Sequence, residues 1–72
     1  MSVIDTYYVY HIIDGAEDTS WPRLGPYKSQ REAWIDARQL ARQEQLDHER
    51  CEGYVVAWCR EEATPDLLSR LF

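Results

Sequence analysis

Three arginines in one short segment are the first residues of this sequence that could do chemistry. Arg31, Arg38 and Arg42 follow one another at intervals that bring side chains to one face of an α-helix. None of them has an Asp or Glu three or four residues away, so no local ion pair would neutralise this stripe. Because guanidinium groups in a row suit bidentate contact with carboxylates or phosphates, the arginine stripe is a candidate binding surface.

A group of four aromatic residues is the second candidate. They stand at even-numbered positions of two β-prone segments and are Tyr8, Tyr10, Tyr54 and Trp58. Alternate residues of a strand point to the same side of a sheet, so we expect the four rings to form one aromatic patch. Tyr and Trp are favoured in the cores of protein interfaces, and exposed rings also stack on the bases of single-stranded RNA. Apart from Arg60, no basic residue lies beside the patch to contact phosphate groups. This favours a protein partner.

Thiols and imidazoles could form a metal site or a nucleophile. His48 and Cys51 have a spacing found in zinc sites, and His11 and Cys59 could complete a tetrahedral set. The two cysteines are separated by a near-extended segment, so one ion could not reach both. A Cys59 nucleophile activated by His11 would lack a third group to orient the imidazole. We therefore predict a protein that is not an enzyme, with no catalytic residue, no metal and no cofactor.

Length, composition and charge limit the class of protein. The 72 residues allow one domain, spanning residues 1–72, and 44% hydrophobic residues suffice for a small core. A net charge of −5 argues against nucleic acid as the primary ligand and against an anionic membrane surface, although residues 23–42 form a basic middle. No apolar run approaches the length of a membrane span, and there is no signal peptide, so we expect a cytoplasmic protein with free thiols.

Hydrophobic periodicity and turn signals indicate the elements that must position these candidates. Residues 3–13 are typical of a strand that ends at the turn dipeptide Asp14-Gly15. Residues 23–27 are either loop or a short antiparallel strand. A capping box at residues 29–32 predicts a helix from residue 30 to about residue 46. Its apolar face is formed by Ala33, Trp34, Ala37, Leu40 and Ala41. Residues 54–59 predict another strand, and Thr64-Pro65-Asp66 predicts a second helix start.

The predicted fold class is α+β, a small single-layer sheet of two or three strands with one main helix on one face and a short C-terminal helix. Because a helix connects the two longer strands, we expect them to lie parallel through a right-handed crossover. We assign the odd-numbered positions of both strands to the helix side, since the small Val, Ala and Cys side chains suit close approach by an alanine-rich helix. The aromatic patch then faces away from the helix.

Something should cover the aromatic patch, because contiguous exposed apolar patches on soluble proteins usually mark interactions. One interpretation is that the C-terminal helix folds back and places Leu67, Leu71 and Phe72 over it. The other is that a second copy of the chain, forming a homodimer, or another protein covers it.

The turn and helix start at residues 25–33 resemble part of a SPOR peptidoglycan-binding repeat. The shared pattern is Gly-Pro-aromatic-x-Ser-x-x-Glu-Ala, present here as GPYKSQREA. A SPOR domain combines two such halves, and this chain contains one. The resemblance therefore implies a tight turn and a capped helix without glycan binding.

In size, acidity and element order the chain is also similar to small phage-encoded anti-defence proteins, including anti-CRISPR inhibitors. This resemblance implies a protein that occupies a partner's nucleic-acid or subunit surface without catalysis. Acidic groups often carry such contacts, and the candidates here are Asp14, Glu17, Asp18, Glu61 and Glu62.

The function we predict is a non-enzymatic, small acidic protein-interaction module, an accessory inhibitor or adaptor of a phage or mobile element that binds a host protein or protein complex. The aromatic patch would form the contact, and the acidic loops or the arginine stripe would set its orientation. The alternative is a nucleic-acid-binding module that uses the arginine stripe.

Overall fold

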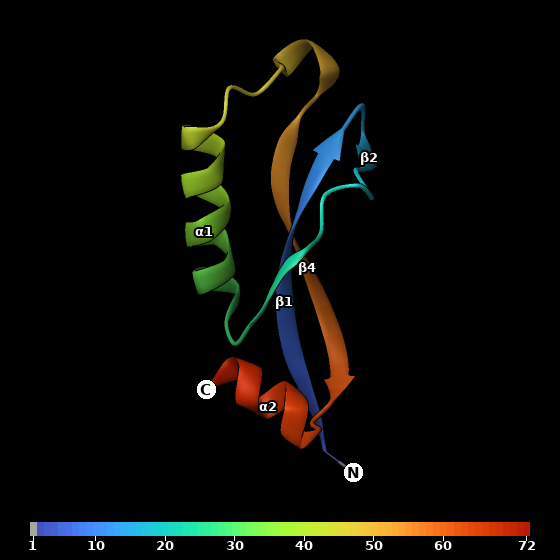
Figure 1. The fold of residues 1–72 in the computed structure, drawn as a ribbon, viewed down its shortest axis with the longest axis vertical. Helices are drawn as coiled ribbons and strands as arrows, with labels where there is room; N and C mark the ends of the chain where they lie inside the picture. Colours follow the sequence, from blue (N-terminus) through green and yellow to red (C-terminus); the bar gives the residue numbers. More distant parts are fainter. Residues whose placement is uncertain (1) are drawn as a thin grey trace.

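In the computed structural model, which describes residues 2–72, one long central strand organises the sheet (Figure 1). β1 (Val3–Ile13) pairs along one side with β4 (Gly53–Glu62), and along the other side with the short strands β2 (Ala16–Glu17) and β3 (Leu24–Tyr27). All three pairings are antiparallel. The α+β class is therefore confirmed, with four strands where two or three were predicted.

The predicted parallel pairing of the two long strands is wrong. After the turn at residues 14–15, the chain runs back along β1 as β2, a loop and β3, whose last residue, Tyr27, lies opposite Tyr7 in the middle of β1. α1 (Gln30–Gln43) then carries the chain to the far end, and β4 must run against β1. The crossover connects β3 to β4, with β1 between them.

Helix α1 begins where the capping box predicts. The Ser29 side chain caps it by accepting a hydrogen bond of 3.1 Å from the Glu32 backbone N–H. Ala33 and Ala37 are 0% and 2% exposed and pack against the equally buried Val9 of β1, since alanine lets the helix approach the sheet closely. The helix ends at Gln43, three residues before the predicted end, because Glu44 adopts an extended conformation and the chain turns through the short 3-10 helix η1 (His48–Arg50) into β4.

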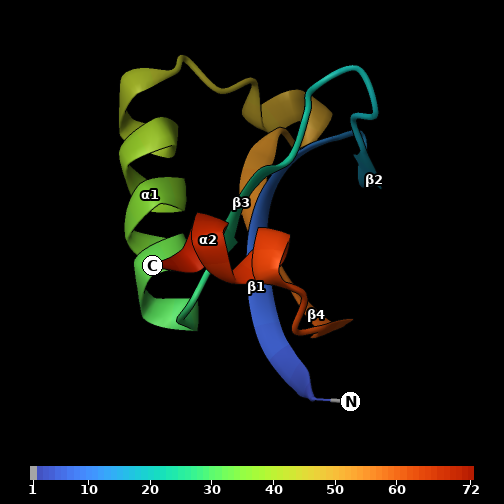
Figure 2. The ribbon, with the colours of Figure 1, turned by 60° about the horizontal axis from the view of Figure 1, so that its bottom comes forward.

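The second helix, α2 (Pro65–Leu71), begins at the predicted cap, where the Thr64 side chain accepts a hydrogen bond of 3.1 Å from the Leu67 N–H. Figure 2 brings forward the end of the molecule where α2 lies across the sheet, next to β3. Leu67 is its buried residue, whereas Phe72 is 85% exposed. The interpretation that placed Phe72 over the aromatic patch is thus wrong for this residue, whose ring lies 5.8 Å from Lys28 Nζ, just before α1.

Candidate functional site

The antiparallel register decides which side chains share a face of the sheet. Val9 lies opposite Val56, and Tyr7 lies opposite Trp58. Paired residues of neighbouring strands point to the same side, so odd positions of β1 share the α1 side with even positions of β4. Assigning the odd positions to the helix side is correct for β1 and wrong for β4.

The four predicted aromatic residues therefore do not form one patch. Tyr54 lies under α1, with its ring centroid 5.4 Å from that of Trp21 in an edge-on contact. Trp58 is also on the α1 side of β4 and is 63% exposed, with the Arg60 guanidinium 5.6 Å from its ring centroid. Tyr8 and Tyr10 remain on the opposite side of the sheet.

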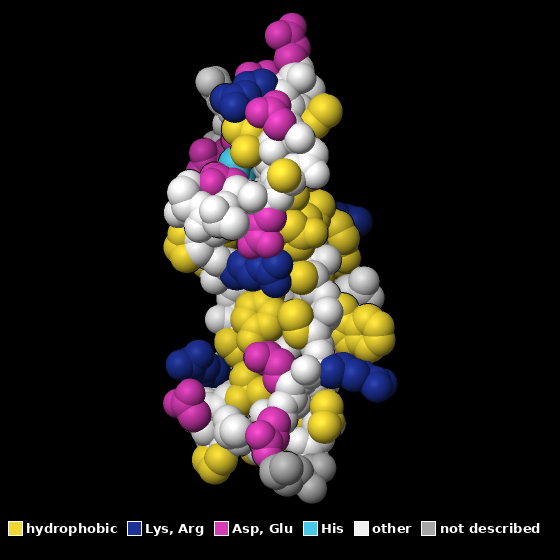
Figure 3. Space-filling model, turned by 90° about the vertical axis from the view of Figure 1, so that its right-hand side faces the viewer, with side chains coloured by type: hydrophobic (Ala, Val, Ile, Leu, Met, Phe, Trp, Pro, Cys, Tyr) yellow, Lys and Arg dark blue, Asp and Glu magenta, His cyan; other side chains and the backbone are white. Residues whose placement is uncertain are grey.

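The side of the sheet turned away from α1 carries a band of apolar side chains, visible in Figure 3. We call it the open sheet face, and its half-buried members are Tyr8, Tyr10, Ile12, Val55, Ala57 and Cys59. At one end of the band, Glu61 accepts hydrogen bonds from Thr6 Oγ1 at 2.5 Å and from Tyr8 Oη at 2.6 Å, which lower the pKa of Glu61.

A single arginine lies over the other half of the open sheet face. The Arg23 guanidinium is 4.8 Å from the centroid of the Tyr10 ring, a cation–π geometry. Glu17 holds it there through two hydrogen bonds of 2.9 and 2.6 Å. These bonds lower the pKa of the Glu17 carboxyl. The open sheet face therefore carries the Arg23–Glu17 ion pair over one half and the hydrogen-bonded Glu61 carboxyl at its other end.

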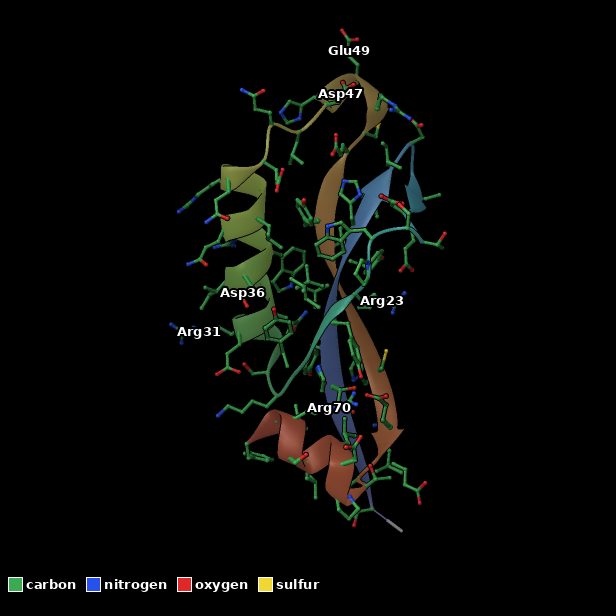
Figure 4. All side chains as sticks on the ribbon, viewed as in Figure 1. Arg23, Arg31, Asp36, Asp47, Glu49 and Arg70 are labelled. Atoms are coloured by element: carbon green, nitrogen blue, oxygen red, sulfur yellow. The ribbon has the colours of Figure 1, made fainter. Side chains whose placement is uncertain are left out.

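The outward side of α1 presents a second surface, which we call the α1 binding face. Arg31, Trp34, Ile35 and Arg38 line a hollow of about 540 Å³ there. Trp34 is 37% and Ile35 is 47% exposed, so two large apolar side chains are partly exposed between two guanidinium groups. Figure 4 shows Arg31 projecting from α1 away from the sheet.

The arginines of α1 differ from the others in their partners. Across residues 2–72, four arginines form ion pairs with carboxylates, namely Arg23, Arg50, Arg60 and Arg70. Within the same residues, no ion pair involves Arg31, Arg38 or Arg42, as their spacing predicted. The sequence analysis missed Trp34, which it placed among the core residues. Trp34 lies 100° around the helix from Ala33 and beside Arg38, and this angle could have indicated that Trp34 lies at the margin of the core.

A histidine between two carboxylates is a cluster that sequence analysis did not find. His11 Nδ1 lies 3.0 Å from Asp18 Oδ2, and His11 Nε2 lies 2.9 Å from Glu52 Oε1. Burial alone would lower the pKa of His11, but the hydrogen bonds and charges of Glu52 and Asp18 raise it. The hydrogen bonds to His11 also contribute to lowering the pKa of both carboxyls, together with backbone and hydroxyl donors.

The contacts of the His11 cluster suit a role in stabilising the fold. Both ring nitrogens already contact carboxylates, so neither is free to act as a general base. Cys59 pairs with Thr6, five residues along β1 from His11 and on the other side of the sheet, so the Cys59–His11 nucleophile considered and rejected in the sequence does not form. Within residues 2–72, no three His, Cys, Asp or Glu side chains are grouped so that they could hold a metal ion.

Most of the acidic groups predicted to contact a partner have partners within the chain. Asp14 pairs with Arg50 at 3.1 Å, Glu17 with Arg23 and Asp18 with His11. Glu61 is bonded to two hydroxyl groups. These contacts hold loops and strands together, which makes the acidic residues a weaker candidate surface than the arginines of α1.

Comparisons with known proteins place this chain in no family. No family model matches it, and neither the curated proteins nor the solved structures contain a match. In residues 2–72 no helix is both long enough and apolar enough to cross a membrane.

Proposed function

We propose that this chain is a non-enzymatic protein-interaction module whose α1 binding face docks onto an acidic surface of a partner protein. The observation that carries the proposal is the exposure of Trp34 and Ile35 between Arg31 and Arg38, which lack acidic partners. Trp and Arg are the residue types that most often dominate the binding energy of protein interfaces. The module would act in the cytoplasm as an inhibitor or adaptor that occupies a working surface of a host protein.

The chemistry of the α1 binding face specifies its partner. Trp34 and Ile35 can bury apolar area against a partner, while Arg31 and Arg38 can each hold a carboxylate through two parallel hydrogen bonds. Arg42 extends the positive charge by one turn beyond the hollow. A partner segment that places an apolar side chain between acidic residues fits this pattern. The net charge of −5 for the whole chain disfavours less specific contacts with acidic molecules.

Reversing both charges of the α1 binding face tests the proposal. We expect R31E combined with R38E to reduce capture of partner proteins from a nuclease-treated lysate of the source organism by at least about tenfold, because carboxylates would then face carboxylates. W34A should weaken capture as well. The circular dichroism of both variants should match that of the wild type, since these side chains are exposed.

A matched control carries the same charge change elsewhere. Lys28 and Arg70 are exposed and lie outside the α1 binding face, although Arg70 pairs with Asp66 in α2. Once circular dichroism shows that K28E combined with R70E is folded, this variant should capture the same proteins as the wild type. Equal capture by the two double variants would remove α1 from the proposal.

The unpaired arginines also favour one second candidate function, the binding of single-stranded nucleic acid with Trp34 as a stacking platform. This function predicts that affinity for a fluorescent oligonucleotide falls steeply with salt, and that each Arg removed from Arg31, Arg38 or Arg42 makes the log–log slope smaller by about 1. Capture that survives nuclease treatment, together with no measurable affinity for the oligonucleotide, would reject it.

A further inference from the structure

The two edges of the sheet differ in how open they are to a further strand. On one side of β1, the edge is formed by the short strands β2 and β3, which are interrupted by a loop, by Pro26 and by a shift of register. Features of this kind keep a sheet edge from pairing with other chains. On the other side, β4 pairs with β1 over ten consecutive residues without a shift of register.

The outer side of β4, which we call the β4 edge, has no strand beside it. In the described residues 2–72, β1 is the single strand paired with β4. The one other backbone hydrogen bond to β4 within this range runs from Thr64 N–H to Glu62 O, at the very end of the strand. In Figure 1 the arrowhead half of β4 extends beyond α1 and forms the right-hand margin of the molecule. Because every second residue of an antiparallel strand turns its N–H and C=O groups away from its partner, these groups of β4 point outward.

The side chains along the β4 edge are uncharged over most of its length. Residues 54–59 contain no charged residue and no proline, and none of the ten residues of β4 is buried. Trp58 lies on the α1 side of the sheet but is 63% exposed, so α1 does not cover it. A long, regular and uncharged edge with an exposed aromatic ring is suited to pair with another extended chain.

We propose that the β4 edge binds an extended segment of a partner protein, which adds to the sheet as an antiparallel strand beside β4. The edge calls for a polypeptide, because its alternating N–H and C=O groups are matched by those of another extended backbone. Backbone hydrogen bonds give such a contact its affinity, and the side chains beside them select the segment.

The exposed side chains at the end of β4 specify the sequence of that segment. On the α1 side, Trp58, Arg60 and Glu62 follow one another at every second position, and all three are exposed. The Arg60 charge is matched by Asp5 of β1, 3.3 Å away, whereas Glu62 lies opposite the apolar Val3. The segment therefore carries a large apolar residue opposite Trp58 and, four positions before it, a Lys or Arg opposite Glu62. The net charge of −5 also attracts a basic segment.

A second copy of β4 lacks this pattern. Two β4 strands that join their edges about a two-fold axis across the strands run antiparallel, so each would need a basic residue four positions before an apolar one. The one basic residue of β4 is Arg60, and Thr64, four positions after it, lies outside the strand. The side chains therefore favour a different chain as the partner.

Hydrogen exchange of the full chain, followed by NMR with a synthetic peptide as the probe, tests the proposal. The peptide TKTVTWTV, capped at both ends, has the Lys four positions before the Trp and is long enough to pair with the exposed half of β4. We expect the peptide to slow the exchange of β4 amides at every second position by at least about tenfold. The newly protected amides should alternate with those already paired with β1.

Two variants with matched controls identify the side chains that select the peptide. W58A should weaken peptide binding at least about tenfold, whereas W34A removes an exposed tryptophan from α1 and should bind like the wild type. E62K should weaken binding about threefold and should prefer a peptide with Glu in place of the Lys. E49K makes the same charge change on exposed Glu49 of η1 and should behave like the wild type.

Each result decides the proposal. The absence of alternating protection at millimolar peptide would overturn it, as would protection of β4 that W58A and E62K leave unchanged. Alternating protection without peptide, appearing only at high protein concentration, would mean that a second copy fills the edge and would also overturn it. The proposal is independent of the α1 binding face, because R31E combined with R38E should still bind the peptide.

Discussion

Replacing Gly25 with alanine is expected to cost about 3–5 kcal/mol of unfolding free energy, the largest effect of any single methyl group in this chain. Gly25 has a φ of +135°, a conformation that side chains rarely adopt. A Cβ there would lie 2.8 Å from Cδ1 of Tyr8 and 2.9 Å from the backbone oxygen of Tyr7. The Tyr7 oxygen belongs to the central strand and cannot move without disturbing the sheet.

Gly15 provides the matched control. It has a φ of +80° in the turn after β1, but a Cβ there would meet no atom within 4 Å. G15A should therefore cost only the conformational term, about 1 kcal/mol. Urea unfolding followed by tryptophan fluorescence measures both variants. A domain of this length has roughly 4–11 kcal/mol of stability, so G25A should populate unfolded chains measurably. Equal losses in the two variants would contradict the close contact at Gly25.

The stability of the protein should depend on pH through His11, the second large effect. The pKa of His11 is raised above its ordinary value of 6.5 by Glu52 and Asp18, against the effect of burial. Its contribution is therefore fully present below about pH 6.5 and is lost as the pH rises through the folded-state pKa. The pKa values of Asp18 and Glu52 are lowered, so their contribution is present above about pH 4.5 and lost at more acidic pH.

Together these shifts predict that the His11 cluster stabilises the fold most between about pH 5 and 6.5. The urea midpoint should be higher at pH 6 than at pH 9. H11A should lower the free energy of unfolding at pH 6 by about 2–4 kcal/mol, because it removes a buried side chain with two hydrogen bonds. It should also remove most of the difference between pH 6 and pH 9.

A conservative variant separates charge from packing. H11Q keeps a polar side chain in the same place but cannot be protonated, so its stability should be nearly independent of pH between 6 and 9. If H11Q retains the pH dependence of the wild type, another group is responsible.

Local sequence signals predicted most of the elements because each depends on neighbouring residues. The capping box at Ser29 and Glu32 and the Thr64-Pro65 start satisfy backbone N–H groups within one helical turn. The Asp14-Gly15 turn accommodates positive φ angles of 54° and 80°. The unpaired state of Arg31, Arg38 and Arg42 within α1 followed from helical spacing alone.

Strand direction, by contrast, depended on the whole chain. β3 is only four residues long and contains Gly25 and Pro26, so its local signal for a strand is weak. It nevertheless carries the chain back along β1, opposite Val9 and Tyr7, and thereby makes β4 antiparallel. Because side chains alternate along a strand, this reversal moved Tyr54 and Trp58 to the α1 side and separated them from Tyr8 and Tyr10.

The sequence by itself therefore determined the α+β class, the starts of both helices and the arginine stripe, since these depend on contacts between residues close in the chain. Only the tertiary structure decided which aromatic rings share a face, that His11 meets Glu52 from 41 positions away, and that Trp34 stands exposed between two arginines. These features depend on strand register and on how far one helix covers a sheet, which local periodicity does not specify.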